Sequence, residues 1–167
     1  MSWWRSLVRT LRRPAPAAAG SATSRATPTV PRRVAPDYVG PVVTRYAPHH
    51  DGAPDPGEVV WTWVPFEEDP SRGKDRPVLL VGDDGPWLLG LMLTSKDHVD
   101  GQVSRSGPGG SHWLDLGTGA WDSQRRPSEV RLDRVLRIDP TTVRREGAVL
   151  PRPVFDQVTR SMAALRG

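Results

Sequence analysis

The chain has 167 residues, which suits one domain with room for a tail, and its formal net charge is +4. It contains no cysteine, so disulfide bonds and cysteine-ligated metal sites are excluded. No apolar run approaches the roughly 20 residues of a membrane-spanning helix. The lack of cysteine fits a reducing compartment, and we expect a cytoplasmic protein.

The positive charge is concentrated in the first third of the chain. Residues 1–55 hold eight Arg and three Asp, a net charge of +5. Residues 56–167 hold 15 basic and 16 acidic residues, a net charge of −1. The basic isoelectric point is therefore set by the N-terminal part, and any phosphate site in the C-terminal part has to be local.

The first 13 residues have the pattern of a short basic amphipathic helix. Its apolar face consists of Trp3, Trp4, Leu7, Val8 and Leu11. Such a helix suits an anionic membrane surface. The alternative is a solvated tail that stays disordered alone, because about three turns of helix are marginal in water.

Residues 14–56 are predicted to be a linker. They are rich in Pro, Ala, Ser, Thr and Gly and contain few large apolar residues. This composition cannot bury enough apolar surface to offset the entropy of ordering. Within it, Tyr38 to Tyr46 is a candidate for a short extended segment that docks on the domain.

From Gly57 onward the pattern changes to short strands separated by turns. In the first strand, Val60, Thr62 and Val64 alternate with larger apolar residues, as in a strand. The predicted strands are 57–64, 77–82, 86–95, 111–116 and 128–132, with a short strand or turn through 134–138. Several short strands at this spacing predict a small barrel or sandwich. Thus residues 57–167 form the predicted domain.

One helix is predicted, at the C-terminal end of the domain. Pro153 suits its first position, and the helix extends to Arg166. Its apolar stripe consists of Val154, Phe155, Val158, Met162 and Leu165. This stripe is expected to pack against the strands.

The loop between the first two strands ends in an Arg-Pro step. Glu67 to Asp75 is too polar to be core, and Pro77 begins the next apolar run. Arg76 therefore lies where a loop enters the sheet. At such a place a fixed charge is held rigidly and still faces a ligand.

Four segments in this order resemble the PemK/MazF toxins of type II toxin–antitoxin systems. They are Gly57–Trp61 (GEVVW), Gly73–Leu80 (GKDRPVLL), Leu91–Ser95 (LMLTS) and Pro127–Asp139 (PSEVRLDRVLRID). The C-terminal helix also falls in the family's place, so the resemblance covers about 57–167. The basic extension before residue 57, the Gly- and Ser-rich segment Lys96 to His112, and Trp113 to Trp121 depart from the family pattern.

The resemblance implies a fold and an activity. The fold would be mostly β, a small SH3-like barrel with a C-terminal helix, and the protein would form a homodimer. The activity would be that of a bacterial growth-inhibiting endoribonuclease that cleaves single-stranded mRNA without a metal ion or cofactor and is blocked by an antitoxin. By position, Arg76 would be the catalytic Arg. Thr94, with Ser95 beside it, would supply the phosphate-binding hydroxyl.

Metal-independent RNA cleavage uses the 2′-OH of the RNA as internal nucleophile, and this chemistry suits those residue types. The phosphorane carries extra negative charge, which a guanidinium stabilises with two directed hydrogen bonds. Protons must also move from the 2′ oxygen and to the 5′ oxygen. The candidate proton handlers are Glu67, Glu68, Asp69 and His98. The candidates for RNA contact are Lys74, Lys96, Glu67, His98 and Trp61, with Trp63 and Trp87 as further stacking candidates.

A structural role is the alternative for each of these residues. Arg76 would pair with Asp75 or Asp133, and Thr94 with Ser95 would simply end a strand. Glu67 to Asp69 and His98 would be solvated loop residues. The corresponding alternative function is a non-catalytic binding module, with the basic N-terminal tail on a membrane surface or nucleic acid.

Overall fold

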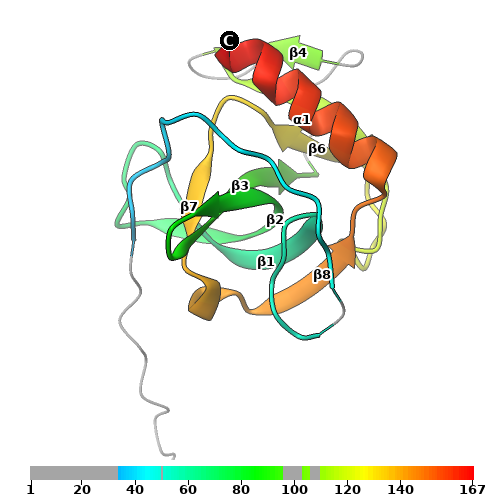
Figure 1. Cartoon of the computed structure of the whole chain (residues 1–167), viewed down its shortest axis with the longest axis horizontal. Coiled ribbons are helices and arrows are strands. Elements are labelled where there is room, and N and C mark those ends of the chain that lie inside the picture. The colour runs from blue at the N-terminus through cyan, green and yellow to red at the C-terminus, as the bar shows by residue number, and fades with distance from the viewer. Residues whose placement is uncertain (1–33, 50, 96–102, 106–109) are drawn as a thin grey trace, which may run out of the picture. The chain divides into compact units, whose positions relative to one another are not determined.

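The computed structural model describes residues 34–49, 51–95, 103–105 and 110–167. Within these ranges, eight strands form one antiparallel sheet, which curls strongly, and an α-helix follows them in the chain (Figure 1). The strands are β1 (Glu58–Pro65), β2 (Gly73–Asp84), β3 (Trp87–Thr94), β4 (Val103–Arg105), β5 (His112–Gly117), β6 (Ser128–Arg131), β7 (Leu136–Ile138) and β8 (Arg145–Val149). The helices are the 3-10 helix η2 (Pro140–Thr142) and α1 (Arg152–Arg166). The predicted mostly-β barrel fold with a C-terminal helix is confirmed.

Two strands were not predicted, and one is longer than expected. β8 has the sequence REGAV, whose charges and Gly hide the strand pattern. β4 has only three residues, within the segment that looked like a Gly- and Ser-rich loop. β2 begins at Gly73, so Arg76 lies inside a strand rather than at its entrance.

Among the described residues, no helix is long and apolar enough to cross a membrane.

The sheet order places β3 at its centre. The order is β4-β5-β6-β3-β2-β1-β8, and β7 pairs with β3. One edge of β3 pairs with β2, and the other pairs first with β7 and then with β6. Thus the last residues of β3 belong to a ladder with β6 that β2 does not share.

Both faces of the central strands are buried. One face carries a cluster that includes Leu79, Leu91 and Leu93 and packs against Phe155 and Met162 of α1. The opposite face carries a second cluster, formed by Val60, Val64, Val78, Leu80, Leu88, Met92, Trp113, Leu136 and Ile138. Burial on both faces explains why these strands read as nearly continuous apolar runs.

The second half of the segment predicted to be a linker docks on the sheet. Tyr38 forms a bridge with Val135, and Thr44 forms one with Gly82. Described residues upstream of the predicted domain start at residue 57 therefore pair with the barrel. We call residues 34–49 the strap.

Side chains fix the strap at both ends. Arg134 is 7 % exposed, and its Nε donates to Asp37 Oδ2 at 2.6 Å. At the other end, Tyr46 donates its hydroxyl to the Leu150 carbonyl at 2.9 Å and packs edge-on against Phe155. The strap therefore joins the segment after β6 to the start of α1.

Replacing Asp37 by Asn should lower the free energy of unfolding by about 2 kcal/mol, because it leaves the buried Arg134 charge without its partner. Urea denaturation measures this loss. Asp156→Asn is the matched control, since Asp156 pairs with Arg152 in a largely exposed ion pair outside the strap. It should cost less than about 1 kcal/mol. Equal losses in the two variants would contradict the proposed role of Asp37 in strap docking.

Candidate functional site

A cavity of about 230 Å³ opens where β2 and β3 separate. Pairing between these strands begins at Val78 and Met92, whereas β2 upstream of this point pairs with β1. The lining residues are Trp61, Lys74, Asp75, Arg76, Pro77, Leu93, Thr94, Ser95, Asp122, Arg126 and Ser128. The cavity thus brings together five predicted site residues, which are Trp61, Lys74, Arg76, Thr94 and Ser95.

Pro77 explains why the two strands separate. Its partner on β1 is Trp61, whose carbonyl accepts a hydrogen bond from the Arg144 amide on the β8 side. The peptide groups of Trp61 therefore point away from β2, and those of the opposed Pro77 point toward β3. Because proline has no N–H, it cannot donate to β3, and the ladder stops there.

Arg76 and Thr94 occupy matching positions beside this separation. β2 and β3 are in register at Val78 and Met92. Two residues further toward the cavity on each strand lie Arg76 and Thr94. Because the side-chain period of a strand is two residues, Arg76 and Thr94 lie on the same faces of their strands as Val78 and Met92. Thr94 is buried and Arg76 half-buried, so a hydroxyl and a guanidinium line the same cavity at the edge of the core.

Arg76 has no ion-pair partner among the described residues. Asp75, its neighbour in sequence, is bound by Arg144, with 2.7 Å between Nη1 and Oδ2. Asp133 is bound by Arg131, with 2.8 Å between Nη2 and Oδ2. Neither of the two structural pairings considered for Arg76 is therefore present.

The surroundings of Arg76 disfavour its charge. Burial lowers the pKa of Arg76, and the positive charge of Arg134 lowers it further. Arginine nevertheless stays charged at neutral pH. Asp37 partly cancels the charge of Arg134. An anion beside Arg76 would relieve both unfavourable effects.

A second charged cluster joins the β1–β2 loop to β6. Arg131 Nη1 donates to Glu67 Oε2 at 2.8 Å, and the His112 amide donates to Asp133 Oδ1 at 2.7 Å. Burial lowers the pKa of Arg131, but Asp133 and Glu67 outweigh it and the pKa is raised. Burial raises the pKa of Asp133, but the hydrogen bonds from Arg131 and His112 outweigh it and the pKa is lowered. Glu67 is thus held by Arg131 and does not line the cavity.

Sequence analysis missed three lining residues, Asp122, Arg126 and Ser128. Arg126 Nε donates to Asp122 Oδ2 at 2.7 Å; the carboxylate side chain is 7 % exposed and the guanidinium side chain 51 %. A buried carboxylate therefore holds a half-exposed guanidinium at the cavity. An Asp followed by an Arg four residues later in a turn-rich segment is a weak signal, and nothing else in the sequence marks these residues.

Hydrogen bonds from Trp61 and Trp121 hold the loop that carries Asp122 and Arg126. Trp61 Nε1 donates to the Trp121 carbonyl at 2.9 Å, and Trp121 Nε1 donates to Ser128 Oγ at 3.1 Å. A Cβ atom at Gly119 would overlap the Trp121 ring. The polar edge of Trp61 thus anchors the loop, which leaves only its ring surface for contact with a base.

The other predicted residues lie elsewhere. Lys96 and His98 fall outside the described residues. Glu68 is exposed, and Asp69 accepts hydrogen bonds from Ser71 in a turn. Trp63 and Trp87 are half-buried and do not line the cavity. Within the described ranges, no group of three or more His, Cys, Asp or Glu residues is arranged to hold a metal ion.

The fold and the site define a small curled β-barrel protein with a C-terminal helix and a cavity where β2 and β3 separate, which we call the fork cavity. Residues 55–165 match the family described as PemK-like, MazF-like toxin of type II toxin-antitoxin system. The match covers more than half of the chain, and the chain belongs to this family. A comparison with curated proteins found no match.

Replacing Asp122 by Asn should lower stability at neutral pH, and the loss should shrink in acid. The hydrogen bond from Arg126 lowers the pKa of Asp122. Its ionised form therefore stabilises the fold above the unfolded pKa of about 3.9, and this contribution is lost as the pH falls through the lower folded pKa.

Urea unfolding of wild type and variant at about pH 7 and about pH 3 measures this difference. Asp115→Asn is the control, since Asp115 is exposed and has no cationic partner among the described residues. A loss for Asp122→Asn that stays constant with pH would contradict the pairing.

Proposed function

We propose that this chain is the endoribonuclease toxin of a type II toxin–antitoxin system. It cleaves single-stranded RNA without a metal ion, through attack of the RNA 2′-OH on the neighbouring phosphate. The observation that carries the proposal is Arg76: it is half-buried at the fork cavity, close to a buried hydroxyl, and has no carboxylate partner among the described residues. Membership of the toxin family supports the same activity.

The arginines near this site differ from Arg76 in their pairing. Each is bound to a carboxylate, in the pairs Arg126–Asp122, Arg131–Asp133, Arg134–Asp37 and Arg144–Asp75. A phosphate that approaches Arg76 therefore displaces no carboxylate of the protein. In a domain without net positive charge, this is how one residue can still attract an anion.

The reaction requires two things of the site, and the first is stabilisation of the negative charge that grows on the phosphoryl oxygens. As the 2′ oxygen bonds to phosphorus and the bond to the 5′ oxygen breaks, negative charge grows on the phosphoryl oxygens. Arg76 donates two N–H groups to these oxygens, and the Thr94 hydroxyl donates a third hydrogen bond. The products are a 2′,3′-cyclic phosphate and a free 5′-hydroxyl.

Proton transfer is the second requirement, because the 2′-OH loses a proton and the 5′ oxygen gains one. Glu67 has to leave its pair with Arg131 before it can accept a proton. His98, with a reference pKa of about 6.5, suits either transfer. Both residues stay predictions for this role.

The family also carries expectations about partners. Toxins of these systems are paired with an antitoxin, and we propose that one blocks the RNA site of this chain. We also propose that the chain acts in bacterial cells as a homodimer that arrests growth when no antitoxin is present.

Purified protein should cleave single-stranded RNA in EDTA, and Arg76→Ala should reduce the rate by about a hundredfold to a thousandfold. The reason is the loss of the donor to the growing phosphoryl charge. Cleavage of a fluorescent oligoribonucleotide measures the rate, and an oligonucleotide with 2′-O-methyl groups should stay intact.

Arg45→Ala is the matched control, since Arg45 is exposed and pairs with Asp83 outside the cavity. Its rate should equal that of wild type. Intact RNA after incubation with folded wild-type protein would overturn the nuclease proposal and favour the non-catalytic binding module.

Arg126→Gln should weaken RNA binding and raise KM while kcat changes little. Arg126 lines the same cavity as Arg76 but is held by Asp122, so we expect it to contact a phosphate that does not react. Removing one phosphate contact should reduce the salt dependence of binding by about 0.7 in the log–log slope.

Fluorescence anisotropy with the 2′-O-methyl oligonucleotide at several salt concentrations measures this slope without cleavage. Arg125→Gln is the control, because this neighbouring exposed Arg does not line the cavity. An unchanged slope for Arg126→Gln would remove Arg126 from the RNA site and leave the role of Arg76 untouched.

A further inference from the structure

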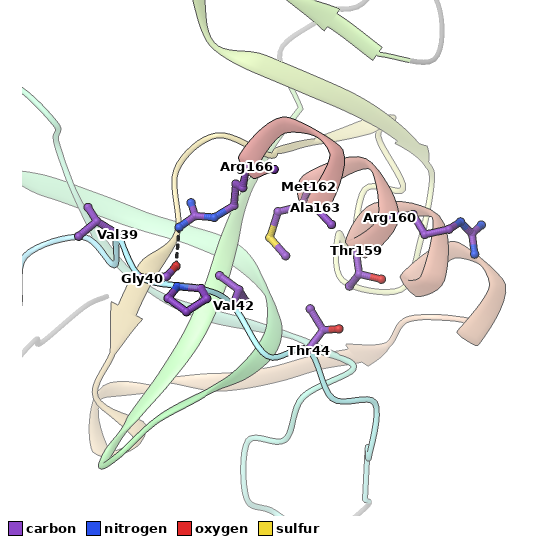
Figure 2. Close-up of a pocket in the computed structure, with 11 residues that line it drawn as sticks. Val39, Gly40, Val42, Thr44, Thr159, Arg160, Met162, Ala163 and Arg166 are labelled. Atoms are coloured by element: carbon purple, nitrogen blue, oxygen red, sulfur yellow. Dashed lines mark hydrogen bonds between the residues drawn. The ribbon is translucent and has the colours of Figure 1, made fainter.

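A groove of about 750 Å³ runs between the strap and α1. Figure 2 shows its two walls, with strap residues on one side and one face of the helix on the other. The strap wall is Val39, Gly40, Pro41, Val42 and Thr44, and the helix wall is Thr159, Arg160, Met162, Ala163, Arg166 and Gly167. It shares no residue with the fork cavity, and the strap wall lies upstream of the family match at 55–165.

The floor of the groove is apolar. It is formed by Val42 and by Met162, which is 2 % exposed, and the exposed Ala163 lies beside them (Figure 2). On the rim, Val39 is 90 % exposed, although the strap around it is fixed to the barrel. An ordered apolar groove with an exposed aliphatic rim is the usual form of a surface that a partner covers.

The groove carries positive charge at both ends. Arg166 donates to the Gly40 carbonyl at 2.8 Å, and no side-chain carboxylate among the described residues pairs with it (Figure 2). Arg160 lies six positions earlier on the helix, about 9 Å along its axis, and no carboxylate among the described residues pairs with it. Asp156, on the same side of α1, is bound by Arg152. No acidic residue lines the groove within the described ranges.

These features favour a peptide over RNA. Single-stranded RNA is held by aromatic side chains on which bases stack, and no aromatic residue lines the groove among the described residues. The chain's own N-terminal segment is also disfavoured, because residues 1–33 carry seven Arg and no Asp or Glu. Its charge has the same sign as that of Arg160 and Arg166.

We propose that this groove binds an acidic segment of a protein partner. Apolar side chains of the segment would fill the space over Val42 and Met162, and its carboxylates would meet Arg160 and Arg166 at the two ends. This interaction surface is separate from the fork cavity and does not depend on RNA cleavage.

A random peptide library displayed on phage tests the proposal. The library is selected on the full-length chain after removal of phage that bind Ala163→Trp, whose larger side chain fills the groove. The recovered peptides should be enriched in Asp and Glu together with Leu, Ile and Val. A synthetic copy of a recovered peptide should bind wild type and lose affinity more than about tenfold in Ala163→Trp.

Two further variants separate the contribution of the groove's shape from that of its positive charge. Ala164→Trp is the matched control, because Ala164 is the exposed neighbour that does not line the groove, and it should bind as wild type does. The double variant Arg160→Gln and Arg166→Gln should bind about tenfold more weakly. Its affinity should also vary less with salt, since the variant has lost the charges that salt screens.

Four outcomes would overturn the proposal. The first is a selection that yields no peptide able to distinguish wild type from Ala163→Trp, and the second is recovered peptides without acidic enrichment. The third is a fluorescent oligouridine or a synthetic peptide of residues 1–13 that binds wild type but not Ala163→Trp. The fourth is a change of oligomeric state in Ala163→Trp, which would make a second copy the occupant. Circular dichroism of each variant establishes that it is folded.

Discussion

The missing N–H of Pro77 is the constraint on which the site depends. Its peptide group points toward β3, so the ladder between β2 and β3 cannot continue past Val78. β3 completes its pairing with β6 instead, and β2 continues beside β1. The fork that results puts a guanidinium and a hydroxyl on two strands that no longer share backbone hydrogen bonds. The cavity there opens without breaking a backbone hydrogen bond of the sheet.

Charge pairing explains how an anion site exists in a domain of net charge −1. Asp75, Asp122 and Asp133 near the fork are bound to Arg144, Arg126 and Arg131 rather than to Arg76. The domain's total charge is therefore a poor guide to the potential at one position, because these pairs cancel locally. The charge of Arg76 has no ion-pair partner among the described residues, and because burial and Arg134 disfavour it, a nearby anion would stabilise it.

The sequence predicted the parts of the fold that periodicity encodes. Alternation marks β1, apolar runs mark β2 and β3, and the stripe from Val154 to Leu165 marks α1. The motif placed Arg76, Thr94 and Ser95 in one site, and they line one cavity.

The contacts that sequence analysis missed depend on distant pairing. β8 is a strand because its backbone pairs with the edge of β1. Asp122 and Arg126 come to the cavity only because Trp61 holds their loop from sixty residues away in the chain. Local patterns contain neither fact.

The strap is another element whose contacts the local sequence pattern did not reveal. It contributes both to the surroundings of Arg76 and to the groove on α1. Its composition is that of a linker, and contacts with the barrel and α1, rather than a core of its own, hold it in place. One end supplies Asp37, which cancels part of the charge beside Arg76, and the middle supplies a wall of the groove on α1. A ligand in the groove affects the fork only if it binds the docked and the released strap with different affinity. Because the strap is itself one wall, any ligand that contacts both walls meets this condition.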